Sequence, residues 1–348
     1  MKLVPYSSFH HLFARLLVVA LAVLPASSLG IPPHHQLDPR DKCIGSASLI
    51  FNFTDSTFIE NLQVLPDGRI LFTTLDTGIL RVIDPRGRDP SPRPLVSLPS
   101  TTGLSGIARL SEDIYAVTGG VHTLFAFEPG SMRVFIVDVS SGRIRDIIGV
   151  PKTAMMNGLV ALPNCRTTLL SADSLTGSIL RIDLSTRRVD VAFSDPLLNS
   201  TSAEVPLGVN GLRIRGQYLY FTNSGAGTFG RVPIDDRGNM AGKVEIVAQL
   251  SGRVSFTNAY DDFDFDRQGN AYLALHSTTV SQVSPSGKQV TFAGCAGDDV
   301  CDPAFIFREP TSVALDNDGK SLYVSTGGNT GMGCSQNLGG QLIRVPLS

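Results

Sequence analysis

Four residues with oxygen-bearing side chains lie about fifty residues apart, or twice that, along the 348-residue chain: Glu60, Asn157, Asn210 and Asp261. Each lies at the start of a short apolar run, and the two asparagines are each followed by glycine. Two carboxylates and two amide oxygens form the hard-oxygen donor set that Ca²⁺, Mg²⁺ or Mn²⁺ prefers. The alternative interpretation is that these residues only cap strand starts and satisfy local backbone groups. Their regular recurrence favours one shared site.

The same interval separates six similar units of sequence. Each unit has a short polar or small pair, an apolar run, a turn and a second apolar run. The pairs open at Glu60, Ser105, Asn157, Asn210, Asp261 and Thr311, about fifty residues apart. Such units, with tight turns like Pro66-Asp67-Gly68, are typical of four-stranded propeller blades. No helical pattern alternates with the apolar runs, which argues against a βαβ fold.

We therefore predict an all-β fold, a six-bladed β-propeller with four-stranded blades around a central channel. The ring is expected to close where the chain ends meet, with a strand around 46–53 completing the blade formed by QLIRVPL at 341–347. The runner-up fold, a pair of β-sandwiches, does not explain the repeat.

The predicted ring brings the opening residues of all six units to one rim of the channel, because every innermost strand starts there. The second strands run back and end near the same rim, which adds Asp173, Asn223 and His276. We expect a small-molecule site at this channel mouth. Its expected substrate-binding residues are Asn157, Asp173, Asn223, Ser105 and Thr311.

Composition narrows the class of partner. The formal net charge is -2, so the basic excess expected of a nucleic-acid-binding protein is missing. Hydrophobic residues make up 42% of the chain and charged residues 17%, which indicates a sizeable buried core. No G-x-S-x-G motif, phosphate-binding loop or dinucleotide fingerprint occurs in the sequence. Serine hydrolase and nucleotide-dependent activities are therefore disfavoured.

The first 30 residues have the layout of a secretory signal peptide, which leaves 31–348 as one propeller domain. The apolar run LLVVALAVLP at 16–25 is too short to cross a hydrocarbon core of about 30 Å as a helix. An uncleaved anchor is the alternative. We expect a secreted monomer or homodimer that has no membrane contact after cleavage, with N-glycosylation sequons at Asn52 and Asn199.

Five cysteines occur, at Cys43, Cys165, Cys295, Cys301 and Cys334. In an oxidising compartment one or two disulfides are expected, with at least one thiol left over. A Cys295–Cys301 bridge is favoured because these two cysteines bracket a short loop, and a Cys43–Cys334 bridge across the ring closure is the other candidate.

Several longer motifs carry a family resemblance: FIENLQVLPDGRIL, MMNGLVALP, LLSADSLTGSILRID, GVNGLRIRGQYLYFTNS, DDFDFDRQGNAYLALHS and PTSVALDNDGKSLYVSTGG. Over 58–328 the chain resembles the senescence marker protein/gluconolactonase family of six-bladed propellers. It is more similar still to the secreted fungal branch of that superfamily. This branch includes hetero-Diels–Alderases of secondary metabolism, which join a tropolone-derived quinone methide to a humulene-type sesquiterpene.

The wider family resemblance implies a metal-dependent lactonase or esterase. Enzymes of that family hold a divalent metal at the channel mouth, which here implies the ligands Glu60, Asn157, Asn210 and Asp261, with Asp262 as the alternative to its neighbour. A bound Ca²⁺, Mg²⁺ or Mn²⁺ would polarise the carbonyl and activate water, and Asp261 would move the proton.

The branch resemblance implies a pericyclase that requires no cofactor. Such a cycloaddition needs two apolar partners held together and donors aimed at the oxygen where charge develops. The expected catalytic residues are Asp261, Asn210 and His276, and the loops at 122–127 and 304–307 are expected to supply apolar surface. We favour this hypothesis over the hydrolase because the branch resemblance covers more residues than the ligand set. A non-enzymatic binding module is the third hypothesis.

Overall fold

The computed structural model describes residues 43–44, 46–123, 126–276, 278–295, 300–329, 332 and 334–347. All of them lie in Asp38–Ser348, one of the two units into which the chain divides. The predicted signal peptide at 1–30 lies outside the described residues, so cleavage and secretion stay predictions. Within the described part of the chain, no helix is long and apolar enough to cross a membrane.

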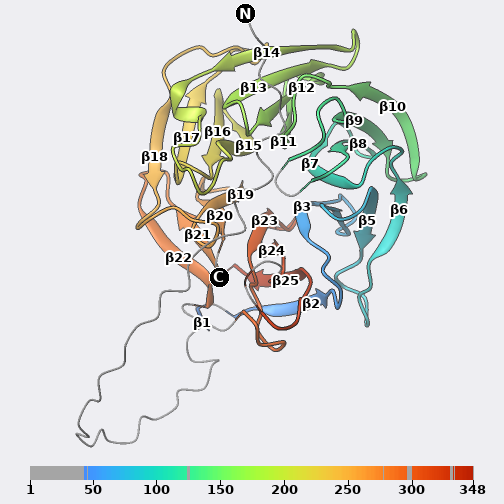
Figure 1. Cartoon of the computed structure of the whole chain (residues 1–348), viewed down its shortest axis with the longest axis vertical. Helices are drawn as coiled ribbons and strands as arrows, with labels where there is room; N and C mark the ends of the chain where they lie inside the picture. The colour runs from blue at the N-terminus through green and yellow to red at the C-terminus, as the bar shows by residue number, and fades with distance from the viewer. Residues whose placement is uncertain are drawn as a thin grey trace, which may run out of the picture. The chain divides into compact units, whose positions relative to one another are not determined.

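The fold is a six-bladed β-propeller of antiparallel sheets arranged in a ring, as the repeat predicts (Figure 1). Blade 1 consists of β3 (Ile59–Val64), β4 (Ile70–Thr74), β5 (Ile79–Ile83) and β6 (Arg93–Ser97). Blade 2 consists of β7 (Gly103–Arg109), β8 (Ile114–Gly120), β9 (Arg133–Asp138) and β10 (Arg143–Gly149). Blade 3 consists of β11 (Met156–Leu162), β12 (Cys165–Asp173), β13 (Ser178–Asp183) and β14 (Arg188–Ser194). Contacts between the first strands of neighbouring blades surround the central axis.

The other three blades follow the same plan. Blade 4 consists of β15 (Val209–Arg215), β16 (Tyr218–Asn223), β17 (Thr228–Pro233) and β18 (Glu245–Gln249). Blade 5 contains β19 (Tyr260–Phe265), β20 (Ala271–Leu275), β21 (Thr279–Val283) and β22 (Gln289–Cys295). Blade 6 consists of β23 (Pro310–Leu315), β24 (Ser321–Thr326), β25 (Gln341–Pro346) and β2 (Ser48–Asn52). A short 3-10 helix, η2 (Pro196–Leu198), lies between blades 3 and 4.

The ring closes as predicted. Strand β2 pairs antiparallel with β25, with Ser48 opposite Arg344 and Asn52 opposite Gln341. In Figure 1 the blue β2 therefore lies beside the red β25, although nearly the whole chain separates them. One strand was not expected: β1 (Cys43–Ile44) pairs with β22 and gives blade 5 a fifth strand.

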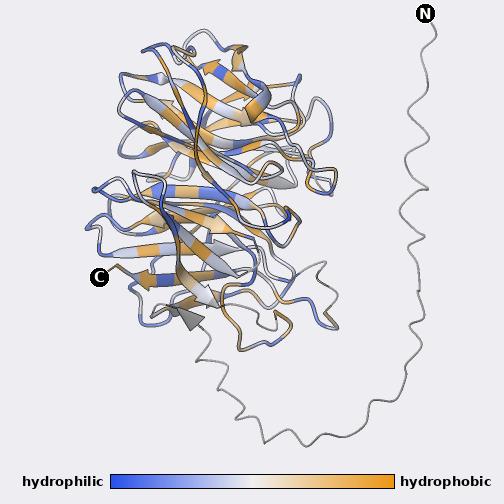
Figure 2. Cartoon of the chain, turned by 90° about the vertical axis from the view of Figure 1, so that its left-hand side faces the viewer, coloured by the Kyte–Doolittle hydropathy of each residue, from blue (hydrophilic) through white to orange (hydrophobic). Residues whose placement is uncertain are grey.

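The hydrophobic core fills the spaces between blades. Successive side chains of a strand point to opposite faces of its sheet, so each blade buries apolar residues against both neighbours. Between blades 3 and 4, for example, Leu170 and Ala172 share a buried cluster with Leu212 and Phe221. Figure 2 shows the resulting alternation of hydrophobic and hydrophilic segments along the strands. Stacking of blades therefore holds the first strands around the axis.

Buried hydroxyl groups link neighbouring blades near the channel. Thr73 Oγ1 donates to the carbonyl oxygen of Ser105 at 2.7 Å, and Ser105 Oγ donates to that of Met156 at 2.7 Å. Thr311 Oγ1 donates to the carbonyl oxygen of Ile59, also at 2.7 Å, and so joins blade 6 to blade 1. Ser105 and Thr311, which open blades 2 and 6, therefore each link their blade to the next one in the ring.

The glycines of the Asn-Gly pairs allow the first strands to approach closely. A Cβ atom at Gly158 would lie 2.4 Å from the carbonyl oxygen of Asn210, and one at Gly211 would lie 2.4 Å from Asp262 Oδ1. Both separations are too short for any residue with a side chain. The glycine of each pair is therefore explained by packing around the axis.

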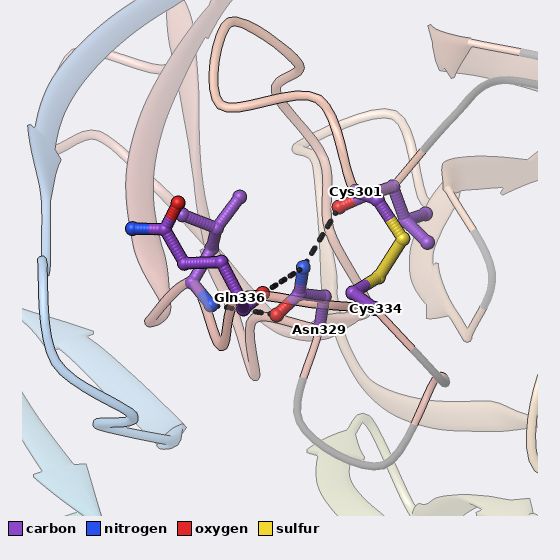
Figure 3. The surroundings of a disulfide bond; sticks show 6 residues. Cys301, Asn329, Cys334 and Gln336 are labelled. Carbon is purple, nitrogen blue, oxygen red and sulfur yellow. Dashed lines mark hydrogen bonds between the residues drawn. A yellow bond between two sulfur atoms is a disulfide. The ribbon is translucent and has the colours of Figure 1, made fainter.

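Cys301 and Cys334 form a disulfide, with their Cα atoms 5.3 Å apart. It joins the segment before β23 to the segment between β24 and β25, beside Asn329 (Figure 3). The predicted Cys295–Cys301 and Cys43–Cys334 pairings are therefore wrong. Closeness in sequence favoured the local pair, but Cys295 ends a strand, opposite Cys43 in the sheet register. Cys165 is a free, exposed thiol.

Candidate active site

Blade 5 brings Asp261 and His276 together at the rim of the channel. Asp261 is the second residue of β19, and His276 directly follows β20. Because Tyr260 pairs with Leu275 in the antiparallel register, both side chains lie at the same end of the blade. His276 Nε2 is 2.9 Å from Asp261 Oδ2, and the two side chains are only 18% and 7% exposed. The expected association of these two residues is thus seen in the structure.

Glu309 lies on the other side of the His276 imidazole, and the sequence did not suggest this residue. Its Oε1 is 3.7 Å from Nδ1 of the histidine, which also faces the carbonyl oxygen of Phe256 at 3.3 Å. Glu309 has a φ of 55°, a left-handed conformation that costs roughly 1–3 kcal/mol for a non-glycine residue. The available signal was its position two residues before Thr311, which opens blade 6.

Glu60 opens blade 1 and is 5% exposed. Its carboxyl group interacts electrostatically with Asp261, His276 and Glu309. We call these four residues the mouth cluster. Three carboxyl groups therefore share one buried region with a single imidazole.

Burial governs protonation in the mouth cluster. Desolvation and the nearby Asp261 charge raise the pKa of Glu60 well above its ordinary value. Desolvation also raises the pKa of Glu309, to about 7. Burial alone would lower the pKa of His276, but the hydrogen bond to Asp261 and the charges of the surrounding carboxylates outweigh it and raise this pKa to about 9. At neutral pH the cluster therefore holds an imidazolium and at least one partly protonated carboxyl group.

Asn210 extends the cluster toward blade 4. Its Nδ2 donates to Ser224 Oγ at 2.9 Å, and its hydrogen bond to Asp261 lowers the pKa of that carboxyl group, against the larger rise caused by burial. The amide oxygen Oδ1 of Asn210 is buried and has no hydrogen-bond partner among the residues that the structure describes. A buried acceptor of this kind can take a hydroxyl donor of a ligand or a hard cation.

The remaining predicted site residues lie elsewhere in the ring. Asn157 and Asp173 are buried on blade 3, and within the described part of the chain Asp173 Oδ1 has no hydrogen-bond partner. Asn223 Nδ2 donates to the carbonyl oxygens of Leu197 and Asn199, so it organises the loop before blade 4. No hydrogen bond or ion pair described in the structure joins these residues to the mouth cluster.

Ser105 and Thr311 are fully buried, and their hydroxyls form the links between blades described above. The two predicted glycosylation acceptors differ in exposure. Asn199 is exposed just after η2, whereas Asn52 is half-buried in β2. Their substrate-binding and glycosylation roles stay predictions.

Asp262 has a different position from Asp261. Its carboxylate accepts from Asn61 Nδ2 at 3.1 Å, from Ser312 Oγ at 2.9 Å, and from the two Nη atoms of Arg213 at 3.1 and 3.0 Å. We call these four residues the axial network. They come from blades 5, 1, 6 and 4, so they link four consecutive blades near the axis of the ring. Asp261, and not its neighbour, therefore contacts His276.

Three of the four expected metal ligands, Glu60, Asn210 and Asp261, interact with one another in the structure. In the described part of the chain, no group of three or more His, Cys, Asp or Glu side chains is arranged to hold a metal ion. The expected set, however, has only two carboxylates, Glu60 and Asp261, beside two amides. The unpartnered Oδ1 of Asn210 next to Asp261 fits a hard cation. The donor chemistry of these three residues is thus compatible with Ca²⁺, Mg²⁺ or Mn²⁺.

No protein-family model matches the chain. Two curated proteins are similar to it. The first, "Putative hetero-Diels-Alderase" of Phoma sp, is 26% identical over 247 residues, which cover 63% of this chain and 68% of that protein. The second, "Putative hetero-Diels-Alderase asR5" of Sarocladium schorii, is 24% identical over 264 residues, 68% of this chain and 62% of that protein. The matches span about two thirds of the relatives' length.

A solved gluconolactonase from Xanthomonas campestris has a similar structure, with a TM-score of 0.59 and 15% sequence identity over 94% of this chain and 99% of that one. At this identity the likeness shows the fold alone. The resemblances that the motifs predict, to hetero-Diels–Alderases and to gluconolactonase-type propellers, are confirmed as resemblances.

Proposed function

We propose that the chain is a pericyclase of secondary metabolism that catalyses a hetero-Diels–Alder cycloaddition. The observation that carries the proposal is the buried mouth cluster, in which His276 lies between the carboxyl groups of Asp261 and Glu309. The names of the two curated relatives support it. By the branch resemblance, the substrates are a quinone-methide-type polyketide and a terpene alkene.

The chemistry requires a hydrogen-bond donor more than it requires a nucleophile. A C=C–C=O heterodiene adds to a C=C bond: three π bonds are consumed, one C–O σ bond, one C–C σ bond and one new C=C π bond form, and no group leaves. Negative charge develops on the carbonyl oxygen, so a fixed donor in a water-poor site lowers the barrier. The protonated carboxyl group of Glu309 supplies such a donor. The hydrogen bond between His276 and Asp261 holds the imidazole in place beside that carboxyl group.

Other groups at the rim would orient the substrates. The unpartnered Oδ1 of Asn210 accepts a hydroxyl of the polyketide partner. The exposed side chains of Leu175, Leu197 and Phe256 lie on loops at the ends of blades 3 and 4, where they offer apolar surface to a terpene.

The test is cyclisation by the purified protein. A tropolone-derived quinone methide, generated in the reaction mixture, and a humulene-type alkene are mixed with and without protein, and the rate and diastereomer ratio of the adduct are measured. We expect a faster reaction and one dominant diastereomer, and both effects should weaken in His276→Asn. An unchanged rate and product ratio with the wild-type protein would contradict the proposal.

The second candidate is a metal-dependent lactonase, and the observation that favours it is the free amide oxygen of Asn210 beside Asp261. Glu60, Asn157, Asn210 and Asp261 would hold the ion, which would polarise a substrate carbonyl and acidify a bound water. A ligand at about 100 times its Kd adds about 2.7 kcal/mol of stability, enough to raise the thermal midpoint by a few degrees. A rise with Ca²⁺, Mg²⁺ or Mn²⁺ that is reversed by EDTA and absent in Asp261→Asn would favour the lactonase, and no rise would count against it.

We also propose that the protein enters the secretory pathway and acts on small molecules as a monomer or homodimer. The signal-peptide layout of the first 30 residues supports this. N-terminal sequencing of protein secreted by a fungal host should give a start near residue 31, and retention of residues 1–30 would contradict cleavage.

A further inference from the structure

Arg308, directly before Glu309, is fully buried. No ion pair to its guanidinium group occurs among the residues that the structure describes. A buried arginine without a carboxylate partner is unfavourable unless hydrogen bonds compensate for the loss of water. The hydrogen bonds of Arg308 must therefore compensate for its burial.

The contacts of Arg308 tie one segment to the strand pair that closes the ring. Nη1 donates to the carbonyl oxygen of Phe305 at 2.6 Å, and Nη2 donates to Oδ1 of Asn52 in β2. The backbone N–H of Arg308 donates to Gln341 Oε1 at 3.2 Å, and Gln341 Nε2 donates to the same Phe305 oxygen at 3.0 Å. Strands β2 and β25 are thus both joined to this segment.

The same segment forms a strained turn. Phe307 and Glu309, on either side of Arg308, have φ angles of 72° and 55°. Two left-handed non-glycine residues so close together persist only where the surrounding structure holds them. The carbonyl oxygens of Arg308 and Glu309 accept hydrogen bonds from Gly328 and Gly327, which fix the far side of the turn. At the end of this turn, Glu309 Oε1 lies 3.7 Å from His276 Nδ1.

We propose that Arg308 is a positioning residue: through Asn52 and Phe305 it holds the turn that presents Glu309 to His276. The effect on catalysis rests on the proposed function, whereas the effect on geometry does not. Asn52 therefore has a structural task through its amide oxygen, separate from any glycan on its nitrogen.

The test compares Arg308→Met with Glu309→Gln. Two readouts are used: the ¹⁵N chemical shift of His276 Nδ1 at a fixed pH, and kcat and KM for the cyclisation described above. We expect Arg308→Met to move the His276 signal in the same direction as Glu309→Gln. We also expect it to lower kcat about tenfold or more and to change KM by less than about threefold. A residue with a purely structural role would lower the melting temperature and leave the His276 signal in place.

Matched control variants distinguish loss of the Arg308 contacts from general effects of a substitution. Arg344→Met, an exposed arginine on β25, should leave the His276 signal unchanged. Thr54→Ala removes the glycosylation sequon but keeps the Asn52 oxygen, so it should behave as wild type. Asn52→Leu removes the acceptor and should behave as Arg308→Met.

A folded Arg308→Met protein with a wild-type His276 signal and a wild-type kcat would overturn the proposal. If Arg308→Met does not fold, Asn52→Leu decides by the same readouts. If the wild-type protein shows no cyclisation, the proposed function fails, but the His276 signal still decides whether Arg308 positions Glu309.

Discussion

Asp261 and Asp262 are adjacent in sequence and are used in different ways. The carboxylate of Asp261 contacts His276 at the channel mouth, whereas that of Asp262 accepts hydrogen bonds from three other blades. Sequence alone left these two aspartates open as alternatives, because either could open the first strand of blade 5. Their hydrogen-bond partners, which are distant in sequence, distinguish them.

At this residue scale, we predict that Asp262→Ala lowers the free energy of unfolding by about 3 kcal/mol, because it removes the hydrogen-bonded partner of Arg213 and leaves only Asp264, at 3.7 Å, to balance that charge. Urea denaturation measures the change. Asp67→Ala, which removes the partner of Arg69 in an exposed ion pair, is the control and should cost less than about 1 kcal/mol. Equal losses in the two variants would contradict a structural role for the axial network.

A second residue-scale prediction concerns pH. The pKa of Glu309 rises from an ordinary 4.5 to about 7 on folding, so its stabilising contribution is complete below pH 4.5 and is lost as the pH rises through about 7. The pKa of His276 rises from 6.5 to about 9, so its contribution is complete below pH 6.5 and is lost as the pH rises through about 9. The thermal midpoint should therefore fall between pH 5 and pH 9.

Glu309→Gln tests the lower part of that range. This variant should lose the decrease in midpoint between pH 4.5 and 7, and the decrease due to His276 should move to lower pH because a nearby carboxylate is removed. Calorimetric midpoints at intervals of half a pH unit measure both. Wild-type and variant curves of the same shape would show that Glu309 does not titrate as described.

At the scale of elements, the disulfide stabilises the connection that carries Arg308 and Glu309. Cys301 and Cys334 enclose a separation of 33 residues, and such a link typically contributes about 2–4 kcal/mol. We expect Cys334→Ser to lower the free energy of unfolding by this amount, measured by urea denaturation without reductant. Cys165→Ser, at the free exposed thiol, is the matched control and should have no effect.

The sequence predicted the repeated strands but not the connections between them. The repeat identifies the six first strands and the closing strand, because each follows a local pattern of apolar runs and turns. Glu309 was missed because it lies in a connection outside the repeated unit. The repeat placed Ser105 at the start of blade 2, but it could not indicate that the hydroxyl donates to the next blade, because a repeat does not give the direction of a side chain. Cysteine pairing likewise depends on how two connections meet.

For the whole molecule, closure of the ring depends on β2. A chain that starts at residue 46 keeps the pairing of β2 with β25 and loses β1 alone, so it should retain a cooperative thermal transition. A chain that starts at residue 54 leaves β25 as an unpaired edge and removes the Asn52 acceptor, so it should lose that transition. Circular dichroism during heating compares the two. A cooperative transition in the shorter chain would contradict closure by β2.

The axial network also makes four blades depend on one carboxylate. Side chains from blades 1, 4 and 6 all donate hydrogen bonds to Asp262 of blade 5. Blades 1 and 6 are the first and last of the ring, so a disturbance in any of these four blades reaches the other three through a single group. The four blades should therefore lose their structure in one step rather than one after another.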